Sequence, residues 1–236
     1  AEMLRGNKPK FRSILPNADG SGRETRVASG ASKKPKKTDV RFSTADTGVE
    51  LLVSVKTLSF RDTKRDSRGR TVLGRYTKNM VRNDHELRAE AMDVHERFPY
   101  AVLVAILFLP YTACDDGEAD KSSFAHAIKT FRARGGRVLP SDPYQQFERM
   151  FIGLYELEEQ EGKRGEVRFF DVMTNPPRRG RPTHGLLTEQ ELVMEITKAY
   201  EIRNEGYIEW ADGAVPPGSE SPVEEDADDL DGADEA

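Results

Sequence analysis

A continuous run of nine apolar residues, from Ala101 to Leu109, constrains the fold of this chain more than any other feature. Pro99 precedes the run and Pro110 ends it. The run is about half as long as a membrane-spanning helix and shows no alternation of polar and apolar residues. Such a segment is typical of a strand that helices cover on both faces. We therefore expect a central buried strand and no contact with a membrane.

The helices and strands expected before and after this strand in the sequence predict an α/β protein with a mixed β-sheet core flanked by helices. Four helices are expected, over 79–97, 122–134, 144–149 and 188–203. The last begins at Thr188, and Glu191 three residues later completes a capping box. A strand pair is expected over 150–157 and 167–173.

A candidate β-hairpin precedes these elements, with strands over 38–42 and 49–57 and a turn at 45–48. If the turn closes symmetrically, Thr44 faces Val49 and the numbers of paired residues sum to 93. Asp39 then lies opposite Ser54. Cross-strand neighbours stand about 5 Å apart, and residues two positions apart share a face of the strand. Asp39, Ser54 and Lys56 are therefore expected to converge, as a hydrolytic site requires.

Charge divides the chain into a basic, weakly ordered arm (1–36), an α/β domain (37–210) and an acidic disordered tail (211–236). The first 41 residues hold eleven bases and four acids, whereas residues 218–236 hold nine acids and no base. Without those nine, 32 acids remain against 36 bases, so the rest of the chain carries a charge of +4. A polyanion, and double-stranded DNA in particular, is the expected partner. The tail is either a solvated terminus or a mimic of phosphate charge that folds back on the basic surface.

The single Cys114 excludes an intrachain disulfide, and no paired histidines or second cysteine supply a structural zinc site. A reducing compartment fits this composition, and we expect a cytoplasmic protein.

Asp39, with Ser54-Val55-Lys56 at the end of the next strand, resembles the motif of the PD-(D/E)XK, or restriction-endonuclease-like, nucleases. In that superfamily an acid lies on one strand and acid-x-Lys on its neighbour, followed by a helix and a further buried strand. The expected elements over 38–110 follow the same order. The resemblance implies a restriction-endonuclease-like fold and a metal-dependent endonuclease that hydrolyses DNA phosphodiester bonds, in bacterial restriction or phage defence.

One acid of the motif is missing, because Ser54 stands where the second carboxylate is expected. Glu50 lies on the same strand face but about 13 Å away, so it is a second choice. Other sources are acids of the 79–97 helix or of the arm, namely Glu86, which we rank first, Glu90 and Glu2.

The resemblance also implies roles for these residues. Asp39, the Val55 carbonyl and Glu86 would hold Mg²⁺, or Mn²⁺ in its place, which polarises the phosphate and activates a water. Lys56 would orient that water or stabilise the developing charge. The implied catalytic set is Asp39, Ser54, Lys56 and Glu50. In the plainer interpretation, Lys56 reaches solvent and Asp39 is its surface salt-bridge partner.

Bases expected to contact DNA lie in the arm, after the hairpin and in a proline-rich segment: Lys33, Lys34, Lys36, Lys37, Arg61, Lys64, Arg65, Arg68, Arg70, Arg179 and Arg181. Residues 179–182 (Arg-Gly-Arg-Pro) resemble the core of an AT-hook, which places arginines in a narrow minor groove, although a basic connecting loop is the alternative.

Two other functions stay open. One is a catalytically inactive DNA-binding module of the same fold, and the other is a protein-interaction subunit. For the nuclease, a homodimer or a larger defence complex is an expected assembly.

Overall fold

The computed structural model describes residues 26–27, 36–37, 39–44, 48–61, 63–116, 121–157 and 165–205. Its strands are β1 (Arg26–Val27), β2 (Lys36–Lys37), β3 (Val40–Thr44), β4 (Gly48–Thr57), β5 (Thr63–Arg65), β6 (Thr71–Leu73), β7 (Val102–Pro110), β8 (Arg149–Tyr155), β9 (Val167–Asp171) and β10 (Leu186–Leu187). Its helices are α2 (Met80–His95), α3 (Ser123–Phe131) and α4 (Glu189–Arg203), with 3₁₀ turns η1 (Tyr111–Cys114) and η2 (Arg132–Arg134). The acidic tail lies outside the described residues, and so does most of the basic arm, of which only the antiparallel β1–β2 pair is described.

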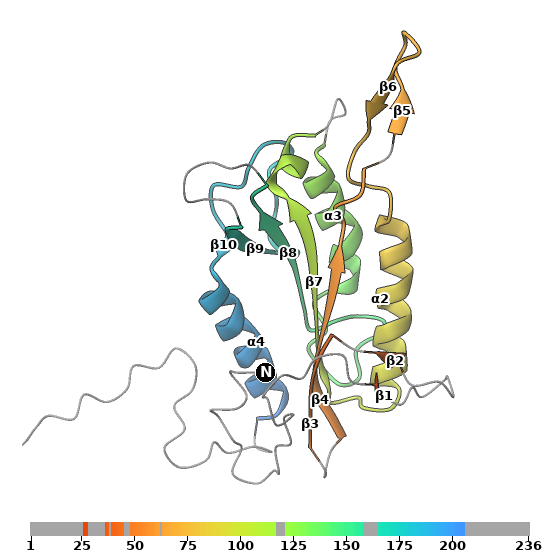
Figure 1. Cartoon of the computed structure of the whole chain (residues 1–236). Coiled ribbons are helices and arrows are strands. Elements are labelled where there is room, and N and C mark those ends of the chain that lie inside the picture. Colours follow the sequence, from red (N-terminus) through yellow and green to blue (C-terminus); the bar gives the residue numbers. More distant parts are fainter. Residues whose placement is uncertain are drawn as a thin grey trace, which may run out of the picture.

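Six strands form one mixed sheet in the order β10-β9-β8-β7-β4-β3 (Figure 1). β4, β7 and β8 are parallel, whereas β3, β9 and β10 each run antiparallel to a neighbour. β7 lies between β4 and β8, and eight of its nine residues are buried. The prediction of a central buried strand is confirmed.

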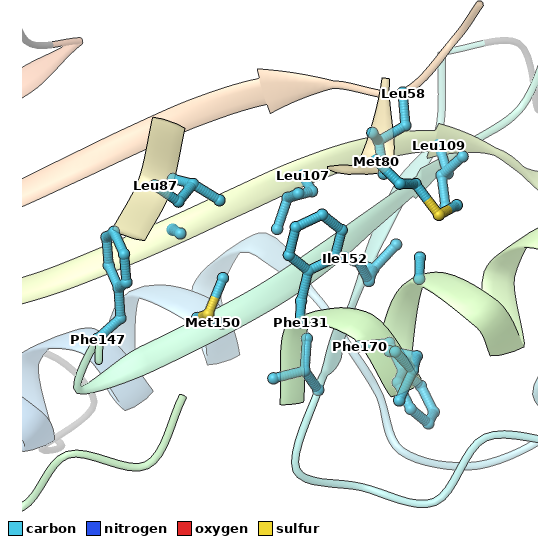
Figure 2. Close-up of a cluster of buried hydrophobic side chains, with 14 of the residues drawn as sticks. Leu58, Met80, Leu87, Leu107, Leu109, Phe131, Phe147, Met150, Ile152 and Phe170 are labelled. Atoms are coloured by element: carbon cyan, nitrogen blue, oxygen red, sulfur yellow. The ribbon is translucent and has the colours of Figure 1, made fainter. Parts of the chain in front are cut away.

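Helices cover both faces of this sheet, α2 and α3 on one and α4 on the other (Figure 1). Alternate residues of β7 face the two layers. Leu103 and Leu107 pack with α2 and α3, whereas Val102 and Val104 pack with α4. Figure 2 shows the first cluster, in which Leu107 lies near Phe131 of α3. Among the described residues, no helix is both long and apolar enough to cross a membrane.

Three of the four predicted helices are confirmed, with ends shifted by a few residues. Thr188 caps α4, and Glu191 completes the predicted capping box. The predicted helix over 144–149 is wrong, because the backbone there bonds to distant segments. The Phe147 N–H donates to the Arg134 carbonyl at 2.6 Å, and the Glu148 N–H donates to the Leu103 carbonyl at 3.0 Å.

β3 and β4 pair in the predicted register over 40–42, where paired numbers sum to 93. Beyond this point the register skips Glu50, which forms a β-bulge and shifts the register by one. The prediction that Thr44 faces Val49 is therefore wrong, since Thr44 pairs with Gly48.

A buried ion cluster joins both helical layers at the end of the sheet where β7 and β8 begin. Glu148 accepts hydrogen bonds from Arg137 at 2.6 Å and from the Leu103 N–H at 2.7 Å. Arg203 of α4 lies 2.9 Å from the same carboxylate, and His95 of α2 lies 3.5 Å from it. Because two arginines face one glutamate here, loss of that glutamate would leave buried positive charge without compensation.

Gly153 of β8 has no space for a side chain, because the Phe108 ring of β7 lies across it. A Cβ at position 153 would stand 2.8 Å from that ring. Gly153→Ala is expected to lower the free energy of unfolding by about 1–3 kcal/mol, measured by urea denaturation. Gly135→Ala is the control, because its Cβ would meet its nearest neighbour at 3.4 Å. An equal loss in both variants would contradict this packing explanation.

Candidate functional site

The second half of β4 borders an open part of the sheet. β3 pairs with β4 only as far as Val53, and from Ser54 onward β4 has β7 as its only described neighbour. Asp39 precedes β3 and occupies this gap, where its Oδ2 accepts the Val55 N–H at 2.7 Å. The N–H and C=O of one strand residue point to the same side of the strand. The Val55 carbonyl therefore faces the edge that Asp39 occupies.

Glu90 of α2 contacts the residues on both sides of Val55. The Ser54 hydroxyl donates a hydrogen bond to Glu90 Oε1, and Lys56 Nζ lies 4.0 Å from Glu90 Oε2. Ser54 is completely buried, whereas the side chains of Lys56 and Glu90 are 25% and 15% exposed. The Lys56–Glu90 pair is thus largely shielded from solvent but still accessible to it. The surface ion pair between Asp39 and Lys56 is not formed.

Helix geometry explains why Glu90 reaches the sheet. Leu87, Ala91 and Val94 are the buried residues of this part of α2. Glu90 lies three residues after Leu87 and four before Val94, so it belongs to the same face. From the sequence, Glu86 is ranked above Glu90. The signal that this ranking misses is the helical spacing, which puts Glu90, like Asp84, within the apolar stripe of α2.

Glu86, ranked first as the extra metal ligand, lies one turn earlier on α2. Its carboxylate forms an ion pair with Arg82 at 2.7 Å, and its side chain is 42% exposed. The structure thus brings Glu90, rather than Glu86, to Ser54 and Lys56. Glu2 lies outside the described residues.

Glu50, the second choice, is directed to the other face of the sheet. The β-bulge turns its side chain toward α4, where it accepts a hydrogen bond from the Tyr200 hydroxyl. Tyr200 belongs to the apolar cluster of the α4 face, whereas Ser54 contacts α2 on the opposite face. The expectation that Glu50 and Ser54 share a strand face is wrong because of the bulge.

The Ser54-Val55-Lys56 segment therefore meets two carboxylates, those of Asp39 and Glu90. The Val55 carbonyl is a third oxygen donor on the same segment. Mg²⁺ prefers oxygen donors, often binds through one or two carboxylates, and keeps several waters. Within the described ranges, no group of three or more His, Cys, Asp or Glu side chains is arranged to hold a metal. A cation here would depend on these two acids, the carbonyl and water.

The bases predicted to contact DNA fall into different surroundings. Lys64, Arg65, Arg68 and Arg70 are all exposed in or between β5 and β6. Arg61 is anchored by its bond to the Gly74 carbonyl at 2.7 Å. Of the arm residues, Lys33 and Lys34 lie outside the described residues, and only the backbone of Lys36 and Lys37 is described.

The two arginines of the AT-hook-like segment are held by acids. Arg181 lies 2.8 Å from Glu156 and packs over the Tyr111 ring at 4.5 Å. Arg179 lies 3.9 Å from Asp115. Entry of both side chains into a minor groove would require these contacts to break, so the geometry favours the connecting-loop interpretation.

Cys114 is buried, and burial raises the pKa of its thiol to about 12. A thiol with this pKa stays protonated near neutral pH, so Cys114 is not a nucleophile. The chemistry of the site rests on its acids and its lysine.

Comparison of the chain with protein-family models, with curated proteins and with solved structures finds no match.

Proposed function

We propose that this protein is a metal-dependent endonuclease that hydrolyses phosphodiester bonds of double-stranded DNA. One observation carries the proposal: Glu90 reaches Ser54 and Lys56 from α2, while Asp39 binds the Val55 N–H. The carboxylate that the motif lacks at position 54 is thereby supplied from the following helix. Each residue of Ser54-Val55-Lys56 contacts an acid.

The order of elements supports a restriction-endonuclease-like fold as part of this proposal. Asp39 precedes β3, and Lys56 lies near the end of β4, which runs antiparallel to β3. Helix α2 then leads to the buried β7, which runs parallel to β4. This is the order that the resemblance implies. Roles in bacterial restriction or phage defence, a cytoplasmic location and assembly as a homodimer or larger complex belong to the same proposal and rest on the resemblance alone.

The residues at the site fit a hard divalent cation. Asp39, Glu90 and the Val55 carbonyl would hold Mg²⁺, which supplies positive charge to stabilise the charge that develops on the phosphate oxygens. Lys56 has an ammonium group beside Glu90 and partial access to solvent, so it can donate a hydrogen bond to a phosphate oxygen or to the attacking water. Ser54 positions Glu90 through its hydroxyl.

Cleavage of mixed plasmid and phage DNA in the presence of Mg²⁺, Mn²⁺ or EDTA tests the proposal. We expect cutting with either metal and none with EDTA, and Lys56→Ala should slow it by about 10²–10³-fold because a charged donor to the transition state is lost. Asp39→Ala should also abolish cutting. Because Asp39 holds the backbone of Val55, thermal unfolding of this variant must show that its fold is retained. Cutting that persists in EDTA, or in both variants, would overturn the proposal.

A second candidate is a DNA-binding module without catalysis. The observation that favours it is that only two carboxylates meet at the segment, with no larger group of metal ligands among the described residues. This candidate predicts DNA binding that is independent of metal and unaffected by Lys56→Ala, with no cutting under any condition.

A further inference from the structure

The β5–β6 hairpin stands apart from the body of the protein (Figure 1). Its two strands pair with each other and with no other described strand. All side chains of β5 are exposed, and in β6 only Val72 is half-buried. It follows β4 directly, so it projects from the end of the sheet at which Lys56 lies.

The base of the hairpin is fixed to the body. Arg61 bonds to the Gly74 carbonyl at 2.7 Å, which joins the two chain segments below the strands, and its guanidinium packs over the Tyr76 ring at 5.0 Å. Tyr76 is buried, and its N–H donates to Ser123 of α3 at 3.0 Å. The base of the hairpin is therefore anchored to the packed core.

The tip of the hairpin is held by a single carboxylate. Asp66 Oδ1 accepts the N–H groups of Arg68 and Arg70, each at 2.9 Å, and Oδ2 pairs with the Arg70 guanidinium at 2.9 Å. Gly69 adopts a φ of +75°, as the tight turn requires. A two-stranded hairpin alone is marginal in water, so these bonds are needed to order it. They leave Arg68 exposed at the apex.

The charges of the hairpin suit a polyanion. Residues 63–73 contain one acid, Asp66, and four bases: Lys64, Arg65, Arg68 and Arg70. Asp66 pairs with Arg70. Among the described residues, Lys64, Arg65 and Arg68 have no carboxylate partner, so three cations are displayed on one narrow projection. None of them helps to bury apolar surface, because all three are exposed.

The size of the hairpin fits one groove of DNA. The three residues of β5 rise about 10 Å at 3.3 Å each, the turn over 66–70 lies beyond them, and the two strands lie about 4.8 Å apart. The major groove of B-DNA is about 12 Å wide and 8.5 Å deep and admits a two-stranded ribbon, whereas the minor groove is only about 6 Å wide. The hairpin is therefore long enough to reach base edges in the major groove, which has the room that a two-stranded ribbon needs.

We infer that the β5–β6 hairpin is a β-ribbon that enters the DNA major groove beside the candidate site, with Arg68 contacting base edges and Lys64 and Arg65 contacting phosphates. The inference rests on the proposed function in taking DNA as the substrate. Arginine commonly binds the O6 and N7 atoms of guanine with two hydrogen bonds, which makes a guanine the expected base. The deep, narrow major groove of duplex RNA would exclude the ribbon, so duplex RNA should bind without this contact.

Selection from a random duplex DNA pool with the Glu90→Gln protein tests the inference, followed by affinity measurements on the selected duplex. We expect a conserved guanine whose replacement by 7-deazaguanine, which lacks N7, weakens binding about 5- to 150-fold. Inosine at the same position removes only a minor-groove amino group and should leave the affinity unchanged. Arg68→Ala, which removes both hydrogen bonds and a positive charge, should weaken binding at least as much and become insensitive to 7-deazaguanine.

Two further variants separate the contacts. Lys64→Ala should weaken binding to all sequences and reduce the slope of log K against log salt by about one. Arg88→Ala, which removes an exposed charge from α2, is the matched control and should change neither sequence preference nor sensitivity to 7-deazaguanine.

The outcomes separate this inference from the proposed function. A flat selection, sensitivity to inosine in place of 7-deazaguanine, or an unaltered Arg68→Ala variant would overturn the hairpin assignment while metal-dependent cutting still stood. Sequence-selective binding that requires Arg68, without any cutting, would support the hairpin and reject the nuclease. Absence of DNA binding would reject both.

Discussion

Replacement of Glu90 by glutamine is expected to reduce Mg²⁺-dependent DNA cleavage by more than about 100-fold. Loss of groups that merely support metal ligands costs about 10–100-fold, and the proposed role of Glu90 is that of a ligand. The amide keeps an oxygen that can accept the Ser54 hydroxyl, so the contact between β4 and α2 is retained. The measurement is a single-turnover rate of plasmid nicking as a function of Mg²⁺ concentration, in which half-saturation should shift to higher concentration.

Glu86→Gln is the matched control for this prediction. Glu86 lies on the same helix, one turn away, but it is exposed and pairs with Arg82. Its replacement should leave the rate within about twofold, because an exposed ion pair contributes little. Equal effects of the two substitutions, or a larger effect of Glu86→Gln, would reject Glu90 as the acid of the site.

Glu148→Gln is expected to lower the free energy of unfolding by about 3–5 kcal/mol and the melting temperature by roughly 6–20 °C. Arg137 and Arg203 would keep their buried charges without the carboxylate that faces both. The same substitution would weaken the link between α4 and the segment before β8, where Arg203 would keep its hydrogen bond to the Val138 carbonyl at 2.8 Å. Calorimetry or thermal circular dichroism measures the shift.

Glu195→Gln is the control for Glu148→Gln. Glu195 pairs with Arg149 at 2.6 Å, but its side chain is 35% exposed, so solvent screens the pair. Its replacement should cost about 1 kcal/mol or less. If Glu148→Gln and Glu195→Gln lose similar amounts of unfolding free energy, burial of the cluster does not explain the contribution of Glu148 to stability.

The buried cluster around Glu148 also makes the stability of the protein depend on pH. Burial opposes the charged form of Glu148, but the His95 ring, the Leu103 N–H and Arg203 outweigh burial and lower its pKa. A carboxylate with a lowered pKa contributes its full stabilisation above its ordinary value near 4.5. This contribution is lost as pH falls through the lower pKa of the folded state. Wild type should therefore lose stability over that acid range more steeply than Glu148→Gln, because glutamine does not titrate.

Much of the fold follows from signals within a few residues of one another. The uniformly apolar run over 101–109 specifies a strand that is buried on both faces, and β7 occupies that place. Thr188 and Glu191 mark the start of α4, since a capping box needs only three residues of separation. The register of β3 with β4 over 40–42 follows from the two strands and the short connection between them.

The spacing of Glu90 puts it on the packed face of α2, but only the tertiary structure decided which acids meet at the site. Ser54 and Glu90 are 36 residues apart, and their contact depends on the rotation of α2 about its axis as its apolar stripe packs on the sheet. The side chain of Glu50 points to the α4 face of the sheet because of one β-bulge, and no pattern in the sequence indicates that bulge. Local periodicity and capping thus determined the elements, whereas packing, which sums contacts between distant segments, determined the set of side chains at Ser54-Val55-Lys56.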